Sequence, residues 1–151
     1  MADQRIDSLI AYARRFIGVP YVYGGNGPHI FDCSGLACTI LKKSGNIRVS
    51  EDLSAQEIYD RLVKQGGTIV DLGKRVGYPV GSFIFYDGGS PKISHVAFMV
   101  DTFSVLEAGG GSSTTNSVEK ARDLGACVRE VFWQHRKDVR AIVFPKFGWQ
   151  L

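Results

Sequence analysis

The chain has 151 residues, of which 44% are hydrophobic and 22% charged, as is ordinary for one globular domain with a single core. Its formal net charge of +3 suits an anionic polymer surface, but it is too small and too scattered to indicate nucleic-acid binding. Three cysteines without short metal-type pairs exclude a disulfide framework. We expect one domain over residues 1–151, reduced and monomeric.

The N-terminal segment, residues 1–7, carries charges of both signs and lacks the apolar stretch of a signal peptide. No apolar run in the sequence approaches the length of a membrane span. We therefore expect a protein that is made in the cytoplasm without a signal peptide and has no transmembrane segment.

Three amphipathic helices are predicted in the first part of the chain. Apolar residues recur at helical spacing over residues 6–17, from near Cys33 to Leu41, and over residues 55–63. Glycines end all three runs: Gly18, Gly45 and the pair Gly66-Gly67. Ser54 and Glu57 have the spacing of a capping box for the third helix. Between the first two helices, three glycines and a proline predict an ordered loop.

From Thr68 onward the hydrophobic period becomes that of strands. Short segments rich in β-branched and aromatic residues predict strands at 82–86, 94–100, 103–108, 126–132 and 140–144. Residues 116–124 fit either a short helix or a long loop. Helices followed by strands, without βαβ alternation, indicate an α+β fold whose N-terminal helices pack on one face of a C-terminal antiparallel sheet.

Cys33 lies at the predicted N-terminus of the second helix. The unpaired amides and the helix dipole at such a position favour a thiolate over a thiol. Asp32 and Ser34 make its surroundings polar, although a lone cysteine in an apolar stretch is usually a small buried hydrophobe. Cys33 is therefore a candidate nucleophile, whereas Cys38, about 140° further around the helix, and Cys127 are expected in the core.

A nucleophilic cysteine needs a base, and the chain has three histidines. His95 begins the strand 94–100, whose apolar residues alternate onto the opposite face. His29 lies in the glycine-rich loop and His135 between two long polar residues, so both are expected to be solvated surface residues. His95 is the candidate base, although a histidine in a strand is often structural.

Glu107 is the candidate partner that would orient His95. A two-residue connection, 101–102, would turn Glu107 to the wrong face. A three-residue connection, 101–103, pairs Glu107 with Ala97 and places it diagonal to His95, within reach of a long side chain. The alternative is a solvated charge at the strand end, but glutamate is poorly suited to strands and its presence there favours a role.

Five blocks of this sequence resemble, in order, the motifs of the NlpC-type cell-wall cysteine peptidases. They are Pro20-Tyr21-Val22-Tyr23-Gly24-Gly25, Phe31-Asp32-Cys33-Ser34-Gly35-Leu36, Ser54-Ala55-Gln56, Gly81-Ser82-Phe83-Ile84-Phe85-Tyr86 and Ser94-His95-Val96-Ala97. The Asp-Cys-Ser-Gly and Ser-His-Val blocks are specific in combination, and the resemblance extends to about Ala108. It implies a papain-like fold and hydrolysis of stem-peptide bonds in bacterial peptidoglycan, typically next to γ-linked D-glutamate.

The resemblance also implies a role for each matching residue. Cys33 would be the nucleophile and His95 the base, with no metal or cofactor. Tyr21 matches the family tyrosine that lies beside the nucleophile and helps to shape the oxyanion site. Asp32 and Ser34 match residues that often contact the free amine of the stem peptide.

Two positions depart from the family pattern. Glu107 stands where His, Asn or Gln is usual for the third catalytic position, which bears on the pH profile and the strength of catalysis. Ser82 stands where Asp is usual after a glycine, which bears on a turn. Three other functions remain open: an acyltransferase of related fold, a binding module that has lost activity, and a metal site built from Cys33, His95 and Glu107.

A cytoplasmic product whose substrate lies beyond the membrane must be released by lysis, injected, or used on recycled wall fragments. We expect a phage-type lysis enzyme, an endolysin, because the sequence shows neither an export signal nor a separate wall-binding domain. A secreted effector and a recycling enzyme are the alternatives.

Overall fold

The computed structural model describes residues 3–73 and 78–151. Its helices are α1 (Gln4–Arg14), α2 (Cys33–Ser44), α3 (Ala55–Lys64) and α4 (Val118–Leu124), followed by a 3₁₀ turn, η1 (Gly148–Gln150). Its strands are β1 (Thr68–Ile69), β2 (Phe83–Tyr86), β3 (His95–Met99), β4 (Ser104–Gly109), β5 (Cys127–Phe132) and β6 (Val139–Phe144). Within these described ranges, the strands form one antiparallel sheet in the order β1-β6-β2-β3-β4-β5. The α+β architecture is therefore confirmed.

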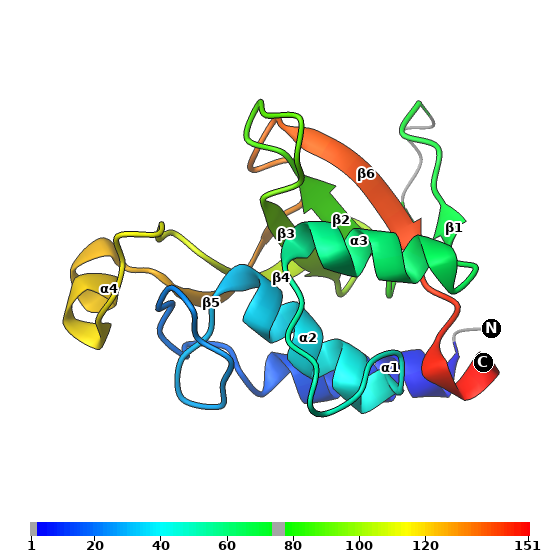
Figure 1. Cartoon of the computed structure of the whole chain (residues 1–151), viewed down its shortest axis with the longest axis horizontal. Coiled ribbons are helices and arrows are strands. Elements are labelled where there is room, and N and C mark those ends of the chain that lie inside the picture. The colour runs from blue at the N-terminus through cyan, green and yellow to red at the C-terminus, as the bar shows by residue number, and fades with distance from the viewer. Residues whose placement is uncertain (1–2, 74–77) are drawn as a thin grey trace.

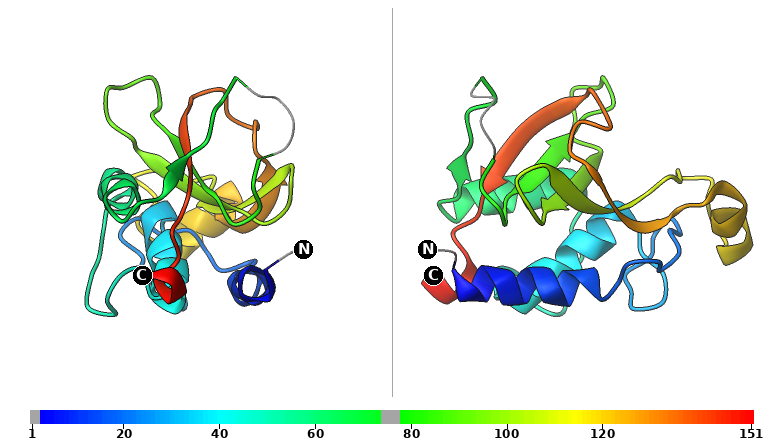
Figure 2. Two further views of the ribbon diagram at one scale, coloured as in Figure 1. Left: turned by 90° about the vertical axis from the view of Figure 1, so that its right-hand side faces the viewer. Right: turned by 180° about the vertical axis from the view of Figure 1, so that it is seen from behind.

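The three N-terminal helices cover one face of this sheet. Alternate residues of β3 and β4, among them Val96, Phe98 and Leu106, share the main core with apolar residues of α1, α2 and α3. The opposite face carries a smaller apolar cluster that includes Tyr86 and Met99. Figures 1 and 2 show α1 and α2 lying together below the sheet, with α4 set apart near the start of β5. The predicted packing of helices on one sheet face is confirmed.

The helix boundaries follow local capping signals. The capping box of Ser54 and Glu57 is formed, and Gly45 ends α2 in the left-handed conformation that glycine adopts most easily. The first helix, however, stops one turn earlier than predicted, at Arg14. Gly18, with φ of +93°, instead turns the chain so that its N–H donates to Val128 of β5 at 2.8 Å.

The five predicted strands are all present, with ends that shift by one residue at most. The pair Thr68–Ile69 was not predicted as a strand, because two exposed residues carry no periodic signal, yet it adds an edge strand beside β6. The segment that fitted a helix or a loop is the helix α4, capped by Ser117 and Gly125.

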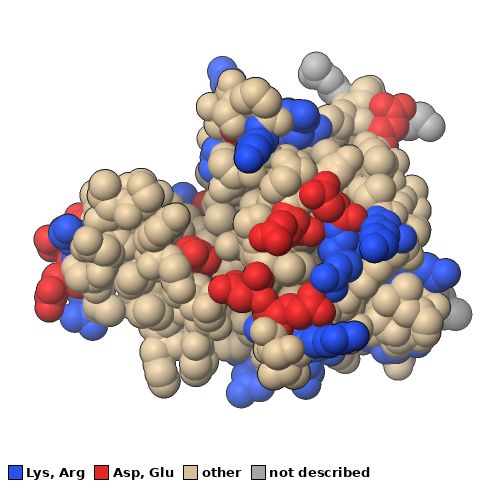
Figure 3. Space-filling view, viewed as in Figure 1, with Lys and Arg blue, Asp and Glu red and all other residues tan. Residues whose placement is uncertain are grey.

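The described part of the chain contains no helix of the length and apolar character that a bilayer crossing requires. Residues 1 and 2, the start of the segment expected to lack signal-peptide character, lie outside the described residues. Figure 3 shows acidic and basic side chains side by side over the face that carries α3. This face therefore presents mixed rather than single-signed charge.

Candidate active site

Cys33 is the first residue of α2, and a network around Asp32 holds it there. Asp32 accepts the Gly35 N–H through Oδ1 at 2.7 Å and the Gly24 N–H through Oδ2 at 2.9 Å. A side chain at Gly35 would overlap the Gly25 carbonyl, so only glycine lets the loop pack against this first turn. The sulfur thus lies at the mouth of a helix, where unpaired amides and the dipole stabilise an anion.

His95 meets Cys33 across the end of the sheet. His95 lies on the face opposite α1 and α2, but the N-terminus of α2 reaches the start of β3, where the Cys33 Sγ lies 3.9 Å from the Ser94 carbonyl oxygen. The His95 residue is 8% exposed, and the sulfur is close enough to its ring to raise the pKa of the imidazole. Both side chains line a groove of about 450 Å³. The structure therefore brings the predicted nucleophile and base together.

The β3–β4 hairpin has the three-residue connection, 101–103, that is needed to place Glu107 on the same face of the sheet as His95. Val100 N–H donates to the Ser104 carbonyl at 3.1 Å, and the register places Glu107 diagonal to His95. The Glu107 Oε1 accepts a hydrogen bond from His95 Nε2 at 2.7 Å. Glu107 is 1% exposed, so the alternative of a solvated strand-end charge is wrong.

Arg129 completes the surroundings of Glu107, and the sequence analysis did not single it out. Its Nε and Nη2 donate to Glu107 Oε2 at 3.0 and 2.9 Å, because β5 pairs Arg129 directly with Glu107. Strand alternation over 126–132 would have shown a charged residue on that face, but the pairing register was needed to choose its partner. Gly109 leaves room for this pair of hydrogen bonds between Arg129 and Glu107, since a side chain at position 109 would overlap the Glu107 carboxylate.

His135 also contacts Glu107, contrary to the expectation of a solvated surface histidine. Its side chain is 21% exposed, and its Nε2 lies 3.1 Å from Glu107 Oε1. His135 follows β5 in an irregular segment, so no periodic pattern pointed to the groove. The same expectation is confirmed for His29, which is exposed in the glycine-rich loop.

The charges around Glu107 oppose the cost of its burial. Burial raises the pKa of Glu107, but the bond to His95, the charge of His135 and the bond to Arg129 together lower it to about 2. Burial lowers the pKa of His95, but the Cys33 sulfur and Glu107 outweigh it and raise the value to about 9. At neutral pH the pair is therefore an imidazolium bonded to a carboxylate, the state that supports an adjacent thiolate.

Tyr21 lies in the wall of the same groove and is 7% exposed. Burial, together with nearby Cys33 and Asp32, raises the pKa of its phenol to about 12, so the hydroxyl keeps its proton and can donate. Ser34 and Asp32 bond to each other at 3.2 Å, and neither is among the described residues that line the groove. Their contact with a substrate amine stays a prediction.

The two other cysteines differ from each other. Cys38 is buried, as expected, and its Sγ bonds to the backbone of Leu53. Cys127 is half-buried at the start of the outer strand β5, so its assignment to the core was wrong. Ser82 is fully buried, and its N–H closes a turn onto Pro79 at 3.1 Å. In residues 3–73 and 78–151, no three His, Cys, Asp or Glu side chains are arranged as metal ligands, which gives the metal alternative no geometric support.

The helices, the antiparallel sheet and the Cys–His pair at a helix mouth define a papain-like domain. Residues 18–136 match the model of the NlpC/P60 family. The chain belongs to this family, and the resemblance inferred from its motifs is confirmed.

Two curated relatives and one solved structure illustrate this membership. The "probable endopeptidase p60" of Listeria innocua is 33% identical over 101 residues, which cover 67% of this chain and 19% of that protein. The "gamma-D-glutamyl-L-lysine dipeptidyl-peptidase" of Bacillus cereus is 32% identical over 104 residues, 68% of this chain and 28% of that protein. The chain thus spans less than a third of the length of either relative. An NlpC/P60 family protein from Bacillus cereus superposes with a TM-score of 0.64 at 21% identity, covering 91% of this chain and 39% of that one, which confirms the fold.

Proposed function

We propose that this protein is a cysteine endopeptidase that hydrolyses stem-peptide bonds of bacterial peptidoglycan, next to γ-linked D-glutamate. One observation carries the proposal: His95 lies between Cys33, at a helix mouth, and the buried carboxylate of Glu107. Membership of the NlpC/P60 family supports the reaction class. The names of the two relatives, an endopeptidase and a γ-D-glutamyl-L-lysine dipeptidyl-peptidase, support the substrate.

In the proposed mechanism, the Cys33 thiolate attacks the carbonyl carbon of the scissile amide. Amide N–H groups in the first turn of α2, together with the Tyr21 hydroxyl, stabilise the oxyanion. The His95 imidazolium gives its proton to the leaving amine as the C–N bond breaks, which leaves a thioester on Cys33. Neutral His95 then takes a proton from water, the resulting hydroxide attacks the thioester, and the carboxylic acid product leaves while the thiolate–imidazolium pair is restored.

Glu107 acts through His95 in this mechanism. Its Oε1 binds Nε2, which leaves Nδ1 for the sulfur, and its negative charge stabilises the imidazolium. Asp32 and Ser34 stay proposed contacts for the free amine of the stem peptide. Because the carboxylate of Asp32 already accepts backbone bonds, that contact requires a further lone pair on the same oxygens.

Mass spectrometry of purified muropeptides tests the proposal. We expect the wild type and the matched control Cys127→Ala to release the same stem-peptide fragments, and Cys33→Ala to release none. Identical product spectra for wild type and Cys33→Ala would contradict a cysteine peptidase. The masses also identify the bond, since cleavage that leaves the γ-D-glutamyl bond intact would contradict the proposed specificity.

Iodoacetamide alkylation at neutral pH separates this function from an inactive binding module. A thiolate–imidazolium pair predicts labelling of Cys33 that is much faster than labelling of an ordinary cysteine. Slow labelling would favour the inactive module. An acyltransferase would instead label quickly and form acylated products without net hydrolysis.

The proposed biological setting is wall lysis by an endolysin. The modest positive charge of the chain supports contact with anionic wall polymers. We expect the purified wild type, and not Cys33→Ala, to clear a suspension of permeabilised bacteria. Cleavage of soluble muropeptides without clearing of whole walls would favour a recycling role.

A further inference from the structure

His135 is a titratable side chain in the groove that the proposed mechanism does not use. It lies in the connection between β5 and β6, and its Nε2 is 3.1 Å from Glu107 Oε1, the same oxygen that binds His95. Its other ring nitrogen, Nδ1, is 3.0 Å from the carbonyl oxygen of Phe132. Both nitrogens of this ring therefore face oxygen atoms.

This arrangement determines which form of the ring fits. A backbone carbonyl oxygen only accepts hydrogen bonds, so His135 Nδ1 carries a proton. In the neutral ring, Nε2 would then direct a lone pair at a buried carboxylate oxygen. In the imidazolium, Nε2 carries a proton and a share of positive charge, and the contact with Glu107 becomes an attraction.

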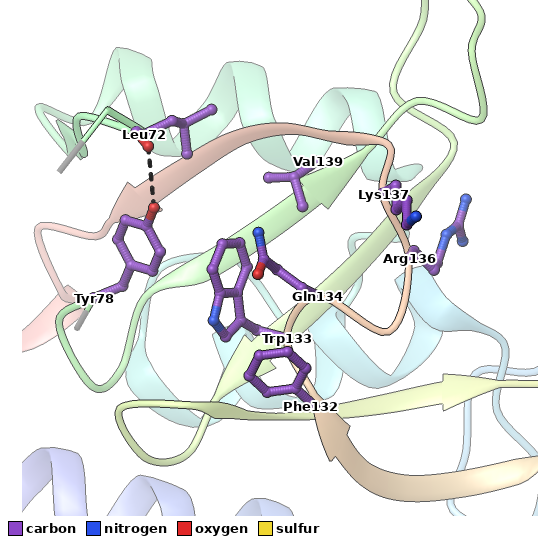
Figure 4. A pocket seen from close by; sticks show the side chains of 8 residues that line it. All are labelled: Leu72, Tyr78, Phe132, Trp133, Gln134, Arg136, Lys137 and Val139. Atoms are coloured by element: carbon purple, nitrogen blue, oxygen red, sulfur yellow. Dashed lines mark hydrogen bonds between the residues drawn. The ribbon is translucent and has the colours of Figure 1, made fainter. Parts of the chain in front are cut away.

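The segment that carries His135 is anchored on both sides. The Trp133 carbonyl accepts the Tyr86 hydroxyl at 2.7 Å, and the indole packs edge-on against Tyr78 with ring centroids 4.9 Å apart. On the other side, the Arg136 guanidinium lies 5.0 Å from the Tyr86 ring centroid and its Nε donates to Asp138 at 2.9 Å. Tyr78, Trp133 and Arg136 line a hollow of about 650 Å³, and Figure 4 shows their side chains from close by. The segment is therefore held as an ordered support for the imidazole.

We propose that His135, as an imidazolium, is a positioning residue: it fixes Glu107 Oε1 for His95, and its charge keeps the Cys33–His95 pair ionised at lower pH. This inference rests on the proposed function, which makes Cys33 the nucleophile and His95 its base. It adds a third cation at Glu107, beside His95 on the same carboxylate oxygen and Arg129 on the opposite one.

The sign of the pH effect follows from the charges around His135. Two titratable groups contact the ring directly, Tyr86 of β2 and Glu107 of β4. His95 of β3 and Arg129 of β5 bind the same carboxylate, and Arg136 and Asp138 of its own segment pair with each other. The other titratable groups that line the groove with His135 are Tyr21, Tyr23 and Cys33. A nearby positive charge favours a thiolate over a thiol. Loss of the His135 charge therefore raises the pH at which Cys33 becomes reactive. Under conditions in which the wild-type ring carries no charge, a neutral variant should match it.

The test is the rate of iodoacetamide alkylation at Cys33, followed across pH by mass spectrometry of its peptide. We compare wild type, His135→Gln and the matched control His29→Gln, which makes the same change at an exposed histidine. The acid limb of the profile is the pH range over which the alkylation rate of Cys33 rises with pH. We expect this limb to lie about one pH unit higher in His135→Gln than in wild type, and the rates at alkaline pH to be unchanged. The profile of His29→Gln should coincide with that of wild type. A His135→Gln profile that coincides with wild type, or an equal shift in His29→Gln, would overturn the proposal.

A second measurement covers the outcome in which His135→Gln does not fold. The ¹⁵N chemical shifts of the His135 ring in the wild type report both nitrogens, and the proposal expects both to be protonated on the acid limb. An unprotonated Nε2 at that pH would overturn it. Alkylation needs no peptide hydrolysis, so a wild type that shows the expected limbs but cleaves no muropeptide would refute the peptidase function and leave this inference standing.

Discussion

Two carboxylates, that of Asp32 beside the nucleophile and that of Glu107 beside the base, are held in opposite ways. Asp32 caps α2 with partners three and eight residues away along the chain, and it stays partly exposed. Glu107 is fully buried, and its hydrogen-bond partners lie 12 and 22 residues away on other strands. If Asp32 lost a hydrogen-bond partner, water could replace part of that interaction, because Asp32 is partly exposed. No water could replace the cations that bind the buried carboxylate of Glu107. The helix mouth is therefore a local structure, and the Glu107 cluster depends on the assembled sheet.

The largest expected effect comes from Glu107→Gln, which keeps the shape of the side chain and removes its charge. We expect kcat/KM for muropeptide cleavage to fall about 100-fold, because His95 loses the anion that orients it and stabilises its imidazolium. The matched control is Glu119→Gln, the same change at an exposed position of α4. Retention of full activity in Glu107→Gln would refute the orienting role.

Gly109→Ala should act on the same cluster without removing any member of it. The added methyl would overlap the Glu107 carboxylate, and the backbone at this position does not require glycine. We expect the carboxylate to shift and kcat to fall about tenfold, as small displacements at a catalytic site do. The thermal midpoint serves as the control for folding. Unchanged kcat in a folded variant would show that the space beside Glu107 is not needed.

Stability against pH should report on the pair of Glu107 and His95. The Glu107 pKa of about 2 lies below the ordinary 4.5, so its contribution is present above about 4.5 and is lost as pH falls toward 2. The His95 pKa of about 9 lies above the ordinary 6.5, so its contribution is complete below about 6.5 and is lost as pH rises toward 9. Urea unfolding should therefore show a maximum between these limits. The same curve in Glu107→Gln would contradict this origin.

The smallest effect is expected at the helix caps. Asp32→Ala and Ser54→Ala each remove an N-cap and should each cost about 1 kcal/mol of unfolding free energy. The two should differ in activity, because Asp32 also holds Gly24 of the loop beside Cys33, whereas Ser54 caps α3 alone. Denaturant unfolding together with muropeptide turnover checks this. An equal loss of activity in both variants would contradict a local role for Asp32 at the helix mouth.

Most of the fold could be predicted because its signals are local. Helical spacing, the capping box at Ser54 and the glycine stops located the helices, and strand composition located five strands. The two-residue strand β1 and the early end of α1 were missed because pairing with β6 and with Val128 decides them, and neither partner is visible in a local window.

The candidate site was predicted in part, and the limit lies at Glu107. Side chains alternate strictly between the two faces of a strand. Once a three-residue hairpin loop was assumed, this alternation placed Glu107 on the same sheet face as His95. Arg129 needed the β4–β5 register, and His135 needed the course of an irregular connection. The sequence around each of them does not identify Glu107 as its partner.

The amino-acid sequence by itself determined the family motifs, the order of helices and strands, and a cysteine at the mouth of α2, because each of these depends on neighbours within a turn or a strand. The tertiary structure alone decided that a buried glutamate would bind one arginine and two histidines from three further segments. The physical reason is that an ionised carboxylate can be buried only where cations converge on it, and convergence is a property of the assembled sheet.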